Sequence, residues 1–215
     1  MAAVSDLIAE LRGMLRDAGF DLYSDTAISN ALYDAELVTV AYKPEATAKD
    51  VEIATADGAR QEVPSEYLRV MDIKYNGSLA APGRGISMVA REHLDLISPS
   101  WRSANLVEEA RQYAYDERNP RVFELFPPVV AGSIVATLVL RPLKYGDLTS
   151  ATTTVGDEYR PALIEYALYR LFSEDTEGTP NESRSRKHYT NFFNFLGIKV
   201  QNEARVSPRQ PEHKT

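Results

Sequence analysis

The chain has 215 residues, a hydrophobic fraction of 44% and a formal net charge of −7. This length suits one domain, or one domain with an insertion, and the acidic balance argues against a protein that grips nucleic acid over much of its surface. The absence of cysteine excludes disulfides, thiolate nucleophiles and thiolate metal ligands.

The N-terminal residues show helical spacing. In SDLIAELRGMLRDAGF the apolar residues fall on one helix face, with Ser5 as the expected N-cap and Gly19 as the expected stop. The stretch SDTAISNALYDAELVTVAYKP predicts a second helix, which Ser24 or Asp25 caps and Pro44 ends. The short link between them predicts an αα-hairpin. The two apolar stripes are Val4, Leu7, Ile8, Leu11, Leu15, Ala18 and Ile28, Ala31, Leu32, Ala35.

From about Lys49 the spacing becomes that of strands. DVEIATADGARQEVP alternates apolar and polar residues around Asp57-Gly58, which predicts a β-hairpin. YLRVMDIKYNG and GSIVATLVLRPL predict two further strands, and SMVAREHLDLIS predicts one short helix before Pro99.

The stretch YDERNPRVFELFPP raises the question of chemistry or structure. One interpretation is a turn at Arg118, Asn119 and Pro120 between two strands, RQYAYDE and RVFELFPP. Pro127-Pro128 is then expected to stop the second strand, because neither residue can donate a ladder hydrogen bond. This hairpin is a candidate partner-facing element.

The alternative interpretation is a small hydrolase. Asp116 and Glu117 would be paired carboxylates, with Arg118 or Arg121 as a substrate clamp. Adjacent strand residues point to opposite faces, so Asp116 and Glu117 would not converge on one substrate. The turn is therefore the favoured prediction.

Two helices are predicted again near the C-terminus. DEYRPALIEYALYRLFSED has one apolar face, and in TPNE the residues Thr179, Pro180 and Glu182 form a capping box with the favoured first-turn proline. This last helix is expected to stop at Gly197. Residues 199–215 are polar and proline-containing, so they are expected to be disordered in isolation.

These elements predict an α+β fold. Neither helix pair can bury its apolar stripe alone, so the two pairs are expected to form a four-helix bundle from residues 1–46 and 157–198. Residues 47–156 are then an inserted, antiparallel β-rich subdomain, and residues 199–215 an extended C-terminal arm.

Cofactor and metal sites are not expected. His93, His188 and His213 are scattered rather than at ligand spacing, and Gly83-Arg84-Gly85 lacks the third glycine of a dinucleotide fingerprint. No apolar run approaches the roughly 20 residues of a membrane span, and no signal peptide is recognisable. The basic cluster SRSRKHY (183–189) is a solvated helix face or a contact for an acidic partner or phosphate.

Tyrosine is the abundant aromatic residue, with 12 tyrosines against 7 phenylalanines. Tyr159, Tyr166 and Tyr169 follow each other at seven- and three-residue steps on a predicted helix. They form either the edge of the core or a subunit interface, since tyrosine is enriched in interface cores.

Four stretches carry a family resemblance: LIAELRGMLRDAGFDLYSDTAISNALYDAE, YLRVMDIKYN, YDERNPRVFELFPP and YRPALIEYALYRLFSED…SRKHYTNFFNFLG. Over most of residues 5–198 the chain resembles the head-to-tail adaptor (connector) proteins of tailed bacteriophages. The resemblance implies a non-enzymatic virion protein, assembled in the host cytoplasm, that forms a twelve-membered ring in the neck. Its implied partners are itself, the portal and the tail or nozzle. Another tail-completion or tail-tube-associated protein is the alternative.

Two expectations follow for such a ring. Double-stranded DNA would pass through an acidic lumen without specific binding. The arm would dock on the portal through small apolar and basic anchors, which are Lys199, Arg205, Val206, Pro208 and Arg209.

Overall fold

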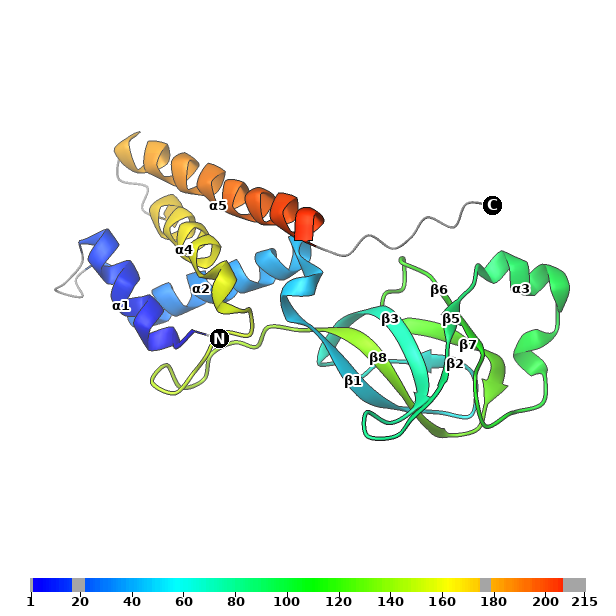
Figure 1. Cartoon of the computed structure of the whole chain (residues 1–215). Helices are drawn as coiled ribbons and strands as arrows, with labels where there is room; N and C mark the ends of the chain where they lie inside the picture. The colour runs from blue at the N-terminus through cyan, green and yellow to red at the C-terminus, as the bar shows by residue number, and fades with distance from the viewer. Residues whose placement is uncertain (1, 17–21, 175–178, 207–215) are drawn as a thin grey trace. The chain divides into compact units, whose positions relative to one another are not determined.

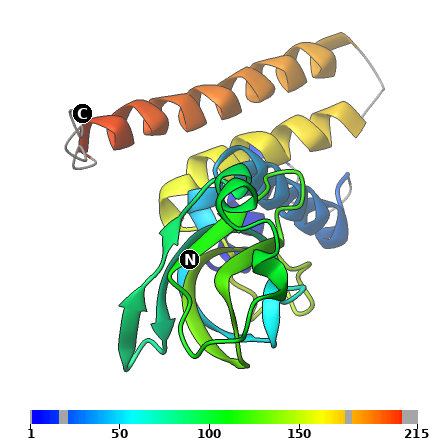
Figure 2. The same ribbon diagram turned by 90° about the vertical axis from the view of Figure 1, so that its right-hand side faces the viewer.

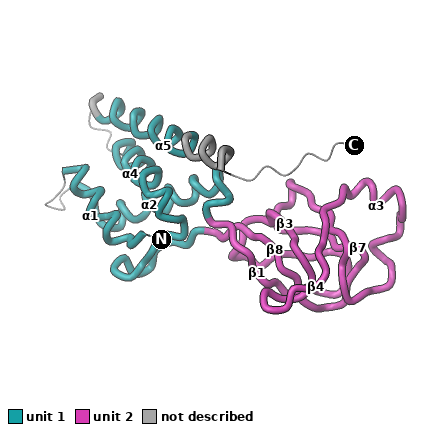
Figure 3. The backbone as a smooth tube through the Cα atoms, viewed as in Figure 1, with its two compact units in different colours: residues 1–46, 142–215 teal, residues 47–141 magenta. Residues whose placement is uncertain are grey.

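The computed structural model describes residues 2–16, 22–174 and 179–206, with the side chains of all of these except 179–180 and 198–206. The chain divides into two compact units (Figure 3): unit 1 is Met1–Ala46 with Pro142–Thr215, and unit 2 is Thr47–Arg141. The fold is α+β, with long helices in unit 1 and two sheets in unit 2 (Figure 1). Residues 142–156, which the sequence pattern places with the insertion, belong to the helical unit.

Within its described residues, unit 1 contains the helices α1 (Val4–Leu15), α2 (Asp25–Tyr42), α4 (Arg160–Glu174) and α5 (Thr179–Val206). Helix α4 packs against the other three, and Figures 1 and 2 show α5 running alongside it. The predicted apolar stripes of α1, α2 and α4 meet in one core, whose burial drives their association. Its main members are Val4, Leu7, Ile8, Leu11, Ile28, Ala31, Leu32, Ala35, Leu163, Ile164, Ala167, Leu168 and Leu171.

The two N-terminal helices begin in different ways. The Ser24 hydroxyl accepts a hydrogen bond from the Ala27 amide at 3.1 Å, which confirms the predicted cap of α2. The prediction of Ser5 as the cap of α1 is wrong, because the helix already begins at Val4. The Val4 amide donates instead to the Ala151 carbonyl at 2.9 Å, so a distant backbone group satisfies this helix end.

The ends of α1 and α5 also differ from expectation. Helix α1 ends before Arg16, which adopts a left-handed φ of 56°, and the stop expected at Gly19 lies outside the described residues. Helix α5 continues through Gly197 to Val206, so the predicted stop at Gly197 is wrong. A glycine inside a helix lowers stability by only about 1 kcal/mol, which neighbouring helix formers can offset. The first eight residues of the predicted extended arm are therefore helical.

Unit 2 consists of two four-stranded sheets that share a core. The first has the order β1 (Ala48–Thr55), β8 (Gly132–Leu140), β3 (Tyr67–Gly77) and β4 (Pro82–Gly85). The second has the order β2 (Gly58–Glu62), β7 (Val122–Val129), β6 (Gln112–Tyr115) and β5 (Ser87–Met88). Neighbouring strands are antiparallel except β5 and β6. Both sheets contribute to the core, with Ile53, Val70, Ile73, Ile134 and Leu138 from the first and Tyr113, Phe123, Leu125 and Val129 from the second.

The predicted hairpin at Asp57-Gly58 is wrong. Strand β1 pairs with β8 and β2 pairs with β7, so this turn carries the chain from one sheet to the other. Gly58 has a φ of 112°, a conformation that favours glycine. The Gln61 side chain holds this turn: its Oε1 accepts from the Ala56 amide and its Nε2 donates to the Ala56 carbonyl, both at 2.8 Å.

The double proline does not stop β7, which contradicts the sequence prediction. The strand runs through Pro127 and Pro128, and the carbonyl groups of Phe126 and Pro128 both accept hydrogen bonds from the neighbouring chain. The Val107 amide donates to the Pro128 carbonyl at 2.9 Å, and the Arg111 amide donates to the Phe126 carbonyl at 2.8 Å. A proline removes a donor but keeps an acceptor, so it is tolerated where the neighbouring chain supplies the N–H groups.

The short helix α3 (Arg91–Ile97) is present where the sequence predicts it. It is followed by a 3-10 turn, Trp101–Ser103, and the two cover a small core of their own beside β2 and β6. Trp101 is fully buried there, together with Leu94.

Candidate interaction surfaces

The stretch that joins β6 to β7 is a turn, as predicted. The Asn119 amide donates to the Asp116 carbonyl at 2.9 Å, and the Arg118 amide donates to Asp116 Oδ1 at 3.0 Å. Arg118 and Asn119 are exposed, and the half-buried Pro120 accepts from the Val70 amide at 2.9 Å. The three predicted hairpin residues therefore form a solvent-facing turn on the edge of unit 2.

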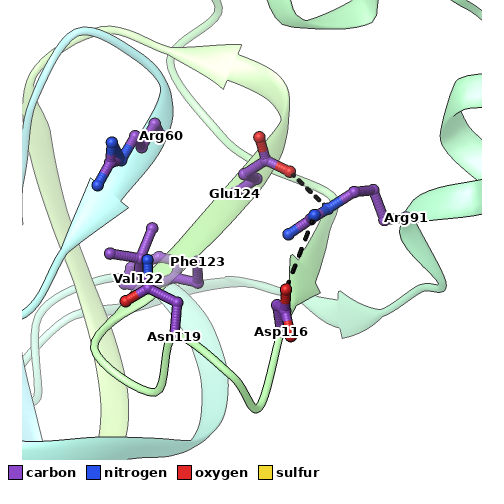
Figure 4. A pocket seen from close by; sticks show the side chains of 7 residues that line it. All are labelled: Arg60, Arg91, Asp116, Asn119, Val122, Phe123 and Glu124. Atoms are coloured by element: carbon purple, nitrogen blue, oxygen red, sulfur yellow. Dashed lines mark ion pairs between the residues drawn. The ribbon is translucent and has the colours of Figure 1, made fainter.

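A pocket of about 280 Å³ lies beside this turn (Figure 4). Asp116 lines it together with Arg60, Arg91 and Glu124, whereas Glu117 is exposed and is not among the lining residues. The Arg91 guanidinium lies between the two acids, with Nε 3.1 Å from Glu124 Oε2 and Nη1 4.0 Å from Asp116 Oδ2.

The same acids belong to a wider ion-pair network. Arg102 Nε donates to Glu124 Oε1 at 2.8 Å, and Arg102 Nη1 donates to Asp95 Oδ1 at 2.6 Å. The indole Nε1 of Trp101 also donates to Asp95 Oδ1, at 2.9 Å, and the Arg102 guanidinium lies 4.4 Å from the centre of the Trp101 ring. The bond from Trp101, aided by Arg102, lowers the pKa of Asp95 below its usual value.

This arrangement favours a scaffold over a hydrolase. Here Asp116 and Glu124 share Arg91, and the geometry does not bring Asp116 and Glu117 to one pocket. Over the described ranges, no group of three His, Asp or Glu side chains is placed to hold a metal ion.

The predicted tyrosine stripe lies mainly inside unit 1. Tyr159 is only 2% exposed and belongs to the core. Tyr166 packs edge-on against Phe192 of α5, with ring centroids 5.0 Å apart, and Tyr169 lies 4.8 Å from Tyr189. Tyr166 and Tyr169 therefore join α4 to α5.

A groove of about 500 Å³ lies among α1, α4 and α5. Its apolar lining consists of Met14 and Leu15 from the end of α1 and Leu168 and Phe172 from α4. Met14 is 50% exposed, so this apolar surface reaches solvent. We call this pocket, with its apolar lining and the rim described next, the helical groove.

The rim of the helical groove is cationic. Arg16 comes from the end of α1, and Arg184 and Lys187 from the basic cluster on α5. None of the three has a carboxylate partner in the described parts of the chain. Arg184 lies 5.8 Å above the Phe172 ring, which is consistent with a weak cation–π contact.

The acid of the helical groove is already paired. His188 Nδ1 lies 2.8 Å from Glu165 Oε2, and Asn191 donates to the same oxygen at 3.2 Å. The His188 ring also stacks on Phe172, with centroids 5.5 Å apart. Within the described residues, the groove therefore presents more positive than negative charge, on a protein that is acidic as a whole.

A comparison with known families decides the identity of this fold. The profile described as SU10 adaptor protein matches residues 2–212, which spans both units. The chain belongs to the SU10 adaptor protein family. A search of curated proteins found no match. Membership confirms the resemblance to phage head-to-tail adaptors, and it implies a structural adaptor and a virion component.

In this SU10 adaptor protein, the predicted docking arm is only partly described. Lys199, Arg205 and Val206 lie in the last turns of α5, where the backbone alone is described. Pro208 and Arg209 lie outside the described residues. None of the helices in the described ranges has the length and hydropathy needed to cross a membrane.

Sequence reasoning missed one buried acid of this adaptor. Glu36 is completely buried in α2, and its Oε1 accepts from the amides of Thr154 and Val155 at 2.6 and 3.1 Å. Desolvation by burial raises its pKa, although the two backbone amides oppose that shift. The available signal was spacing, because Glu36 follows Leu32 by four residues on the apolar face of α2.

Proposed function

We propose that this SU10 adaptor protein forms a homo-oligomeric ring of twelve in the phage neck, which joins the portal to the tail and lets DNA pass. The observation that carries the proposal is the family match over residues 2–212. The two-unit architecture supports it, since a ring subunit needs two different faces for head-to-tail contacts that close.

The charge of the chain supports passage of DNA without specific binding. A net charge of −7 per subunit accumulates around a ring. An acidic lumen forms few phosphate contacts, and sequence-independent binding of DNA depends on such contacts. DNA is then a passing cargo rather than a ligand.

The helical unit is proposed to act as a single bundle at the subunit contact. Helix α4 is its centre, because it packs against α1, α2 and α5. Tyr166 and Tyr169 remain candidates for the edge of the subunit interface. Tyr159 is buried in the core, so it is no longer a candidate. The exposed turn at Arg118, Asn119 and Pro120 is the candidate tail-facing element.

The portal-docking segment is proposed to be residues 199–215. Since α5 continues to Val206, residues 199–206 of the docking segment would dock as the end of a helix rather than as an extended strand. Lys199, Arg205 and Arg209 supply positive charge, and Val206 and Pro208 supply apolar contact.

Native mass spectrometry of the purified chain, alone and with the portal protein, tests the ring. We expect a single closed oligomer, of twelve copies, on the portal. A chain that stays monomeric with and without portal contradicts the proposal. A chain that binds isolated tail protein but never portal instead identifies a tail-completion protein.

Two truncations test the docking segment. Deletion after Val206 removes only residues 207–215, whereas deletion after Ile198 also removes the last two turns of α5. We expect the longer deletion to abolish portal binding and the shorter one to weaken it, with little change in the melting temperature of the core. Portal binding equal to that of the full chain by the longer deletion would refute the assignment.

A further inference from the structure

Helix α3 presents large aliphatic side chains to solvent. Leu96 is 84% exposed and its neighbour Ile97 is 68% exposed. The acidic residue Glu92 is exposed one helical turn before Leu96, and the carboxylate of Asp95 adjoins it in sequence. Single exposed apolar residues are common, whereas Leu96 and Ile97 are neighbours that are both exposed. We call Glu92, Asp95, Leu96 and Ile97 the α3 knob.

The α3 knob is held in place from below. Leu94, on the opposite side of the helix, is 3% exposed and packs in the small core with Trp101. Asp95 accepts hydrogen bonds from both Trp101 and Arg102. Leu96 and Ile97 cannot turn into the core without breaking these contacts. A fixed apolar anchor loses little conformational freedom on binding, so it suits docking.

The helical groove of unit 1 has the complementary chemistry. Its apolar lining reaches solvent at Met14, and its rim carries Arg16, Arg184 and Lys187 without carboxylate partners in the described part of the chain. The α3 knob offers the converse, two aliphatic side chains beside the carboxylate of Glu92, which has no ion-pair partner among the described residues, whereas Asp95 is already paired with Arg102. Short helical anchors that enter apolar grooves are a common recognition mode.

We propose that the α3 knob of one copy docks into the helical groove of the next copy. This inference rests on the proposed ring and names the contact that joins its subunits. Each copy carries one knob and one groove, so every subunit donates once and accepts once around a closed ring. Because knob and groove are different surfaces, the contact is heterologous, as ring formation requires.

The lack of cysteine allows a clean cross-linking test of this contact. Tagged Met14→Cys protein is mixed with untagged Ile97→Cys protein, with and without portal, under mild oxidation. Only an intermolecular contact can yield the mixed disulfide, and a disulfide needs Cα atoms within about 7 Å. We expect the mixed dimer to form in large excess over the one from Met14→Cys with Leu79→Cys. Leu79 is an exposed aliphatic residue of unit 2 outside α3.

Association of otherwise wild-type protein gives an independent readout. Leu96→Asp should weaken self-association at least tenfold, whereas Leu79→Asp should change it less than twofold. Both residues are exposed, so the variants keep the fold. Lys187→Glu should weaken association, and adding Glu92→Lys to it should restore part of the loss, which a purely structural role of either residue would not do.

The outcomes separate this contact from the ring itself. Mixed disulfides together with weakened association of Leu96→Asp support the proposal. A ring that forms without the mixed disulfide and is insensitive to Leu96→Asp overturns the knob-in-groove contact but leaves the ring intact. Failure of both ring and disulfide, even on the portal, overturns both. Loss of portal binding by Leu96→Asp without any mixed disulfide overturns a second copy as the occupant of the groove.

Discussion

The pocket beside the turn between β6 and β7 and the helical groove differ in how their charged side chains are paired. In the pocket, Glu124 is shared by Arg91 and Arg102, and Arg91 also reaches Asp116. In the groove, the rim cations have no carboxylate partner among the described residues. Charges paired within a chain help to fix its own elements, whereas unpaired exposed charges remain available to another molecule. The comparison supports a scaffold role for the first region and the docking role proposed above for the second.

The largest expected loss of stability comes from replacing Trp101, the buried residue that supports the ion pairs of unit 2. Trp101→Ala should lower the free energy of unfolding of unit 2 by roughly 3–5 kcal/mol, because a large buried ring leaves a cavity and Asp95 loses a donor. Hydrogen exchange followed by mass spectrometry should show faster exchange in β2, β6 and α3, with unit 1 unchanged. Leu96→Ala on the exposed side of α3 is the matched control, expected within about 0.5 kcal/mol. Equal effects of the two changes would refute a scaffold role.

In unit 1, the buried carboxylate of Glu36 is stabilised by backbone amides rather than by arginines. Glu36→Ala should lower the stability of unit 1 by about 1–3 kcal/mol, because the amides of Thr154 and Val155 lose their acceptor. Glu36→Gln keeps an oxygen at that position and should be much milder. Hydrogen exchange in α2 at increasing denaturant concentration measures the stability of unit 1 in both variants. Two variants of equal stability would mean that these hydrogen bonds contribute little.

The ion-pair network of unit 2 should have an intermediate effect. Glu124→Ala takes an acceptor from both Arg91 and Arg102, which should lower the free energy of unfolding by about 1–2 kcal/mol, since the network is partly exposed to solvent. Glu62→Ala, which breaks only the exposed pair with Arg121, should change it by less than about 0.5 kcal/mol. Urea denaturation of both variants checks the ranking. A larger loss from Glu62→Ala would contradict it.

Glu36 should also make the stability of unit 1 depend on pH. Because burial raises the pKa of Glu36 in the folded protein above its ordinary value of 4.5, the contribution of Glu36 to stability is most favourable below that value and is lost as pH rises through the folded pKa. Asp95 has a lowered pKa, so its contribution is present above its unfolded pKa and is lost as pH falls. Unfolding of the Glu36→Gln variant from pH 4 to 8 should show a flatter profile in unit 1. An unchanged slope would exclude Glu36 as its source.

The smallest expected effect concerns the unpaired cations. Lys187→Ala should leave the free energy of unfolding within about 0.5 kcal/mol of the wild type, because Lys187 has no carboxylate partner among the residues that the structure describes. Thermal unfolding of the monomer measures this directly. A clear destabilisation would mean that Lys187 stabilises the fold itself, and the contrast between the two regions would weaken.

Local sequence patterns predicted the elements better than their partners. The spacing of apolar residues located α2 and the core face of α4, and the Ser24 cap followed from local hydrogen bonding. The pairing of β1 with β8 could not be predicted, because a turn signal such as Asp57-Gly58 shapes the backbone without choosing its neighbour. The course of β7 through Pro127-Pro128 depended on donors from Val107 and Arg111, which only the tertiary fold brings near.

The interaction surfaces were predictable in part. The cluster 183–189 indicated a basic helix face, but its apolar floor comes from α1 and α4, which are distant in sequence. The stretch LDLI in α3 contains three aliphatic residues in four, more than one face of a short helix can bury, and this was the available signal for the α3 knob. The ion pairs around Glu124 had no local signature, since arginine side chains reach partners far along the chain.

Unit 2 is an insertion into the helical unit, and its first and last residues lie close together. Its two ends are adjacent, because Ala48 pairs with Val139 and the Thr47 hydroxyl donates to the Leu140 carbonyl at 2.9 Å. A segment with neighbouring ends can be lengthened, trimmed or exchanged during evolution while the helices on either side keep their connection. Sequence change within unit 2 can therefore be accommodated without change in the helices of unit 1.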